Sequence, residues 1–222
     1  TPKFYEKAFI YINQPVVGEN LKKELLDIFE NENSKDIVKD IYFKNLVVQK
    51  RIISPLNNIN TLEPFLNTFY NYIKNTYSFD INYKFISVMK FIGFDKDFMD
   101  MNDIYANKFH VDWVKPGTLR TFIPVNLNEN SSFFQIIPFD KWSHALDLGY
   151  KSRIQQGGLE SSKHIIDINS SRNIIFDASR ILHKQNVSPN TTPILILLMF
   201  ELNDKFSFKS SISNIGILNR EK

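Results

Sequence analysis

The chain has 222 residues and a mass of 26.0 kDa, with 43% hydrophobic and 23% charged residues. This length suits one domain with its own core, and the composition excludes global disorder. No cysteine occurs, which excludes disulfides, zinc fingers, iron–sulfur clusters and thiol nucleophiles. A metal site must therefore use histidine and carboxylate ligands. The net charge of +3 is spread over interspersed acidic and basic residues, so we expect no nucleic-acid partner.

The longest apolar stretch, Ile194 to Phe200, is far shorter than the roughly 20 residues that a membrane helix needs. We therefore expect no membrane partner. The first residues, Thr1-Pro2-Lys3, lack the apolar core of a signal peptide, and a cytoplasmic location is expected. Because the chain starts with Thr rather than Met, a removed leader is an open alternative.

The first third of the chain is expected to be rich in helices. Alternating apolar and polar residues predict a strand from Phe4 to Asn13. Apolar residues at helical spacing predict one helix over Leu21 to Asn31 and another up to about Tyr77, with Thr61 as its N-cap. Two β-prone runs lie between these helices, within Ile41 to Ile53.

From Asn82 onward, short β-branched and aromatic runs alternate with polar turns, which is typical of a β-sandwich or barrel. A helical pattern over Lys141 to Gln156 interrupts them. The seven expected strands are Tyr83 to Phe94, Lys108 to Trp113, Leu119 to Leu127, Phe133 to Ile137, His164 to Ile168, Asn173 to Phe176 and Pro193 to Leu202. We expect one domain over residues 1–222, comprising an α-rich N-terminal support (1–80), a β-barrel core (82–208) and a peripheral tail (209–222).

Three residues are candidates for a metal site. His110 and Asp112 stand two residues apart in a β-prone run, so both side chains would leave the same face of a strand. His183 follows the expected strand Asn173 to Phe176 after a short segment. If these segments are neighbours in a barrel, the trio leaves half of an octahedral Fe(II) ion open. Taken alone, however, a His-x-Asp pair is common, and a histidine on a strand is more often a hydrogen-bonded structural residue.

The three residues lie within two stretches, Asn107 to Pro138 and Phe176 to Phe200. They resemble the phytanoyl-CoA dioxygenase-like family of Fe(II)/2-oxoglutarate oxygenases. The resemblance implies a mainly β fold with flanking helices, a double-stranded β-helix of the jelly-roll, cupin-like type. It implies Fe(II), 2-oxoglutarate as cosubstrate and O2 as the other reactant. It also implies that the metal ligands and catalytic residues are His110, Asp112 and His183.

The family usually carries an arginine about ten residues after the second histidine, where it pairs with the far carboxylate of 2-oxoglutarate. Here Pro193, Ile194 and Leu195 occupy that region. Either another cation replaces the arginine, or the cosubstrate binds differently. Arg120 is the first candidate for this cation and Lys90 the second, and the alternative for Arg120 is a solvated residue on the outside of the barrel.

The sequence supports a role in the site less strongly for the remaining candidate residues. Trp113 and Gln135 are candidates for lining the cosubstrate pocket, although packing explains each of them as well. His144 and His164 are expected on the surface or beside the site rather than as ligands. Asp177 is expected to cap the turn before the second histidine, with orientation of that imidazole as the alternative.

The expected function is that of a non-haem Fe(II)/2-oxoglutarate-dependent dioxygenase that hydroxylates a small molecule. The carboxylate of Asp112 argues against halogenase variants, in which a small residue takes its place. One alternative is a cupin-like metalloenzyme that does not use 2-oxoglutarate, and another is a non-catalytic ligand-binding barrel. Four basic residues near the expected inserted helix indicate either a solvated face or a lid for an anionic substrate: Lys141, Lys151, Arg153 and Lys163. The sequence specifies neither the substrate, nor the oxidised position, nor the oligomeric state.

Overall fold

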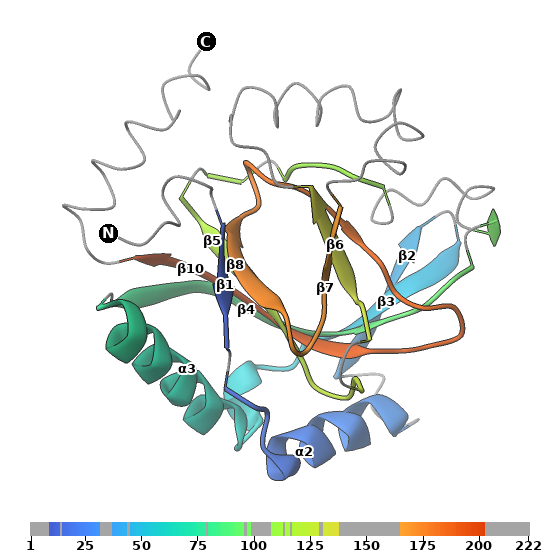
Figure 1. The fold of residues 1–222 in the computed structure, drawn as a ribbon. Helices are drawn as coiled ribbons and strands as arrows, with labels where there is room; N and C mark the ends of the chain where they lie inside the picture. The colour runs from blue at the N-terminus through green and yellow to red at the C-terminus, as the bar shows by residue number, and fades with distance from the viewer. Residues whose placement is uncertain are drawn as a thin grey trace.

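The fold is built from two antiparallel sheets and flanking helices (Figure 1). It was determined as a computed structural model, which describes residues 9–13, 15–31, 37–43, 45–78, 80–95, 97–98, 108–112, 114–115, 117–128, 131–137 and 165–202. The expected helix over Lys141 to Gln156 and the tail 209–222 lie outside these residues. Neither of the helices α2 and α3 described below has the length and apolar character that crossing a bilayer requires.

A seven-stranded major sheet faces a three-stranded minor sheet. In spatial order, the major sheet contains β1 (Phe9–Ile12), β8 (Asn173–Asp177), β5 (Leu119–Pro124), β10 (Ile194–Leu202), β4 (Ile81–Phe91), β3 (Leu46–Ile52) and β2 (Val38–Phe43). The minor sheet contains β7 (Ile166–Ile168), β6 (Phe134–Ile137) and β9 (Leu182–Gln185). This architecture confirms the predicted double-stranded β-helix with flanking helices.

Alternate side chains of β10 serve two separate cores, as the twofold repeat of a strand requires. Leu195 and Leu197 pack with Phe134 of the minor sheet. Ile196 and Leu198 point the other way and pack in the core that includes the helices. We call the face of the major sheet that is turned toward the minor sheet the inner face, and the opposite one the outer face.

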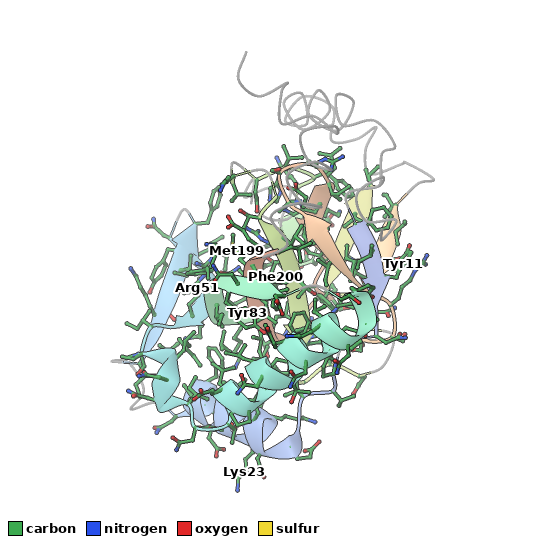
Figure 2. The ribbon with its side chains drawn as sticks, turned by 90° about the vertical axis from the view of Figure 1, so that its left-hand side faces the viewer. Tyr11, Lys23, Arg51, Tyr83, Met199 and Phe200 are labelled. Carbon is green, nitrogen blue, oxygen red and sulfur yellow. The ribbon has the colours of Figure 1, made fainter. Side chains whose placement is uncertain are left out.

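The helices α2 (Glu19–Glu30) and α3 (Leu62–Tyr77) cover the outer face (Figure 1). Each buries one apolar stripe, with Leu25 and Phe69 fully buried. The Phe69 ring lies 5.9 Å from that of Phe200 on β10, and the Tyr83 hydroxyl of β4 donates to the Leu66 carbonyl of α3 at 2.9 Å. Figure 2 labels Tyr83 and Phe200 at this contact between sheet and helix.

The N-terminus of α3 differs from the prediction in one detail. Thr61 does precede the helix, but its side chain makes no capping hydrogen bond. Its hydroxyl donates instead to the Glu24 carboxylate of α2, and its backbone N–H donates to the same group. This contact ties the two helices together, because Glu24 is on α2 and Thr61 immediately precedes α3.

The expected strand within Phe4 to Asn13 and the two β-prone runs within Ile41 to Ile53 correspond to β1, β2 and β3, and all three belong to the major sheet. Two other sheet elements differ from prediction. Residues 108–112 of the expected strand Lys108 to Trp113 form an isolated bridge rather than a strand. Strand β9, which carries His183, was not among the seven expected strands. An inserted 3-10 turn, η2 (Leu56–Asn58), connects β3 to α3.

Candidate metal centre

The fold brings His110, Asp112 and His183 together from distant parts of the sequence. One potential ligand atom from each residue lies within 4.8 Å of the other two. The backbone holds this arrangement, because His110 N–H donates to the His183 carbonyl at 3.0 Å and His183 N–H donates to the His110 carbonyl at 2.9 Å. Asp112 N–H donates to the Ala178 carbonyl at 2.8 Å, in the turn before β9. All three side chains are therefore positioned by main-chain hydrogen bonds.

Each imidazole is oriented in the same way by a carbonyl two residues earlier. The Nδ1 atom of His110 lies 2.6 Å from the Lys108 carbonyl, and that of His183 lies 2.7 Å from the Ile181 carbonyl. A carbonyl can only accept, so each Nδ1 carries the proton and each Nε2 carries the lone pair. Metal-binding histidines are held in this way by a second contact that fixes the tautomer.

The Nε2 atoms of both histidines converge on one oxygen of Asp112. The distances to Oδ1 are 3.4 Å from His110 and 3.5 Å from His183. The other carboxylate oxygen, Oδ2, forms an ion pair with the guanidinium of Arg120. Burial would raise the pKa of Asp112, but the neighbouring His183, His110 and Arg120 outweigh it and hold the pKa below its ordinary value. The carboxylate is therefore ionised and available as a ligand.

Aromatic rings surround the inner side of the centre. His183 is only 2% exposed, and its ring lies 5.4 Å from Phe134 and 5.3 Å from Phe176. Burial lowers the pKa of His183, more than the carboxylate of Asp112 raises it. The neutral imidazole is the form that binds a metal. The rings also limit the access of water from this side of the barrel.

The turn before β9 is stabilised by Asp177, as the sequence predicted. Its buried carboxylate accepts hydrogen bonds from the N–H and hydroxyl of Ser179 and, at 3.0 Å, from Gly117 N–H. Burial raises the pKa of Asp177 despite these donors. The Nδ1 atom of His183 donates to Ile181 instead, so the contribution of Asp177 is to the turn that positions His183.

The other predicted site residues lie in different places. Arg120 is on the inner face beside the trio, since it is paired with Met199 in the sheet. Lys90 is on the outer face, because its cross-strand partner is Ile194 of the helix-facing core. Gln135 points away from the barrel interior and donates to the Asp167 carboxylate at 2.7 Å. The structure therefore brings Arg120 to the trio, but not Lys90 or Gln135.

Some predicted residues cannot be compared with the structure. Trp113, His144 and His164 lie outside the described residues, as do the four basic residues of the expected lid. Conversely, sequence reasoning did not nominate Arg51, which lies on the inner face of β3 because its sheet partner is Met89. No sequence signal marks Arg51, since the pairing register of β3 decides which way it points.

Arg120 is expected to matter most for stability when the metal is absent. Arg120→Gln removes the cation from the ionised Asp112 and should lower the unfolding free energy of the metal-free protein by about 2 kcal/mol. A bound metal ion also neutralises Asp112, so the loss should be smaller in protein saturated with Ni(II). Thermal unfolding with and without Ni(II) measures both effects, and Arg120→Lys, which keeps the charge, should fall between wild type and Arg120→Gln. Equal losses in the two forms would contradict this role.

No protein-family model matches the chain, and no curated protein matches it by sequence. Solved structures do share its fold. The epimerase SnoN in complex with Fe3+, alpha ketoglutarate and nogalamycin RO has a TM-score of 0.55 and 10% identity, covering 90% of this chain and 80% of that one. HygX from Streptomyces hygroscopicus, solved with nickel, 2-oxoglutarate and hygromycin B, has a TM-score of 0.56 and 6% identity, covering 90% and 85%.

A third structure with this fold is a prolyl hydroxylase from Trichoplax adhaerens in complex with a peptide fragment of hypoxia inducible factor. Its TM-score is 0.50 at 10% identity, covering 96% of this chain and 90% of that one. At these identities the similarity shows the fold, and membership of the phytanoyl-CoA dioxygenase-like family stays a prediction. The chain has the fold of proteins that have been solved with a metal ion and 2-oxoglutarate.

Proposed function

We propose that this protein is a non-haem Fe(II)/2-oxoglutarate-dependent dioxygenase that hydroxylates a small molecule. The observation that carries the proposal is the convergence of two oriented Nε2 atoms and one carboxylate oxygen within 4.8 Å. Two imidazoles and one carboxylate with open positions are the ligand set of non-haem Fe(II) oxygenases. The fold shared with SnoN and HygX supports the proposal, because those proteins were solved with a metal and 2-oxoglutarate.

The residues present fit an iron ion. Both Nδ1 atoms donate to backbone carbonyls, so Nε2 is the nitrogen of each ring that would bind the metal. Asp112 keeps one oxygen toward the histidines while Arg120 holds the other. When bound, Fe(II) supplies the redox chemistry that couples oxidative decarboxylation of 2-oxoglutarate to hydroxylation of an unactivated C–H bond.

The chain itself contributes orientation and exclusion of water. Arg120 holds the Asp112 carboxylate in place, and we propose that it also contacts the cosubstrate, since its ion pair with Asp112 brings its guanidinium beside the trio. Phe134 and Phe176 pack beside His183, and Phe122 lies 5.0 Å from Phe134. These rings form an apolar wall that keeps bulk water from the reacting groups.

A small-molecule substrate is proposed on two grounds. The printed ligands of SnoN and HygX are nogalamycin RO and hygromycin B, which are small molecules. The interspersed surface charges give no sign of a nucleic-acid interface. We also propose a cytoplasmic location and a single domain over residues 1–222.

One observation favours a second candidate, a cupin-like metalloenzyme that does not use 2-oxoglutarate. Of the residues that stand where the resemblance places an arginine, Leu195 packs in the core between the two sheets and Ile194 packs in the helix-facing core, so neither supplies a cation. A carboxylate buried there without a cation would cost several kcal/mol. The cosubstrate therefore needs a cation from another strand, or it does not bind.

Anaerobic titration of the metal-free protein with Fe(II), with and without 2-oxoglutarate, tests the proposal. We expect the weak visible charge-transfer band of a chelated Fe(II)–2-oxoacid to appear only when both are present, and to be absent from Asp112→Ala. Iron binding without this band would favour the cupin-like metalloenzyme. No iron binding would favour a non-catalytic ligand-binding barrel.

A further inference from the structure

Two arginines from different strands point to the inner face of the major sheet. Arg51 of β3 is opposite Met89, and Arg120 of β5 is opposite Met199, and both methionines pack in the core between the two sheets. Directly opposed residues of an antiparallel pair leave the same face of the sheet. Figure 2 labels Arg51 on β3 and Met199 on β10. The guanidinium of Arg120 lies near enough for an Nη2 contact of 3.5 Å to the Met199 sulfur.

The two guanidinium groups are close enough for their positive charges to repel each other. Burial and, after it, the charge of Arg120 lower the pKa of Arg51. Arginine stays protonated at any physiological pH, so the pair carries two positive charges on one face of the barrel. Only one of these charges has an acidic partner within the part of the chain that the structure describes, because Asp112 pairs with Arg120.

The remaining hydrogen-bonding capacity of the pair is large. The hydrogen bond of Arg51 to a described residue is from Nε to the neutral Gln49 amide oxygen at 2.9 Å. The Nε atom of Arg120 is buried and has no hydrogen-bond partner among the described residues. Buried donors are normally satisfied, and the exceptions call for an explanation such as a ligand. An anion between the two side chains would satisfy the donors and offset the like-charge repulsion.

The strand register also suits a ligand that extends inward from the metal. Met89, the sheet partner of Arg51, is itself opposite Leu195 of β10. Leu195 is one of the apolar residues that stand where the family resemblance expects an arginine. A guanidinium from β3, two strands away from β10, can therefore supply the positive charge that β10 lacks at this level of the barrel.

We propose that Arg51 and Arg120 together form a binding site for a carboxylate-type anion beside the metal centre. The inference rests on the proposed function for the identity of its ligand, which is either the far carboxylate of the 2-oxoacid cosubstrate or an anionic group of the substrate. Arg120 serves the end nearest Asp112, and Arg51 serves the end that is remote from the metal ligands.

The first arm of the test compares two 2-oxoacids in the Ni(II)-loaded full chain, which binds ligands without turnover. The probes are 2-oxoglutarate and 2-oxobutyrate, which share the chelating head but differ in the far carboxylate. If this carboxylate is the ligand, Arg51→Gln should weaken 2-oxoglutarate about tenfold or more in calorimetry and leave 2-oxobutyrate unchanged. Lys50→Gln is the matched control, because it removes the same charge from the outer side of the same strand, where Lys50 pairs with Asp40 at 2.9 Å. Arg51→Lys should weaken 2-oxoglutarate less than Arg51→Gln.

The second arm uses inorganic phosphate as a probe of the substrate's anionic group, added to the Ni(II)–2-oxoglutarate protein. Phosphate binding that depends on Arg51, with 2-oxoacid binding unaffected, assigns the site to the substrate. If neither probe depends on Arg51, the inference is wrong. If wild-type protein binds Ni(II) but neither 2-oxoacid, the proposed function fails, and phosphate binding to the Ni(II)-loaded protein still decides the anion site.

Discussion

His183→Ala is expected to lower the affinity for Fe(II) or Ni(II) by about 100-fold or more and to abolish 2-oxoglutarate-dependent turnover. Loss of a residue that merely supports a metal ligand costs about 10- to 100-fold, so the loss of a ligand itself should exceed that range. His183 is the most buried of the trio, and its Nδ1 atom is already bound to Ile181. No side chain of alanine size can replace its Nε2 atom. Calorimetric titration of the metal-free variant with Ni(II) measures the change.

Two controls separate the loss of a ligand from damage to the core. His110→Ala removes a ligand from a less buried position and should lose metal affinity to a similar extent. Phe176→Leu disturbs the packing against the His183 ring but keeps all three ligands, so its metal affinity should remain close to that of wild type. Wild-type metal affinity in His183→Ala would remove His183 from the ligand set.

Gly93→Ala is expected to lower the unfolding free energy by about 3 kcal/mol or more, because the added methyl group has no room. A Cβ atom at this position would lie 2.1 Å from the Ser188 carbonyl oxygen and 2.9 Å from that of Thr191. Both are backbone atoms, so no side-chain rotation relieves the clash. The same segment is held by Gly93 itself, whose N–H donates to the Thr191 carbonyl at 2.8 Å.

Gly18→Ala is the matched control for this substitution. Gly18 precedes α2, and an added Cβ would meet no heavy atom within 4 Å. Alanine is a poorer residue than glycine before a helix, so a loss of up to about 1 kcal/mol is expected. Urea denaturation of both variants gives the comparison, and equal small losses would show that the segment at Ser188 moves aside at little cost.

The helices could be predicted from the sequence because their signal is local. Leu21, Leu25 and Phe29 recur at helical spacing, and the structure buries all three in α2. The strand Leu182–Gln185 could not be predicted, since it is short and contains one apolar residue among polar ones. Its burial comes from pairing with β6 and from the surrounding core, which are properties of the tertiary structure.

The candidate site was predicted only in part, because only some of its residues are marked by a local pattern. His110 and Asp112 were nominated from their His-x-Asp spacing, and all three ligands from the family resemblance. The structure places His110, Asp112 and His183 together. The orientation of Arg120, Lys90, Gln135 and Arg51 depends on the register of each strand, where a shift of one residue turns a side chain to the other face. That register is set by long-range pairing such as Arg51 with Met89, which the sequence does not encode locally.

The strand pairing has a consequence for how the chain folds. Strand β1 pairs with β8, and β4 pairs with β10, so the partners in both pairs are more than 100 residues apart in the sequence. Proteins dominated by such distant contacts fold slowly, typically over milliseconds to seconds. During synthesis, β1 and β4 must wait until β8 and β10 have left the ribosome. The metal ligands His110 and His183 are also far apart in the sequence and meet only when the barrel has formed, so acquisition of a metal ion should be among the last events of folding and a direct signal that the barrel has closed.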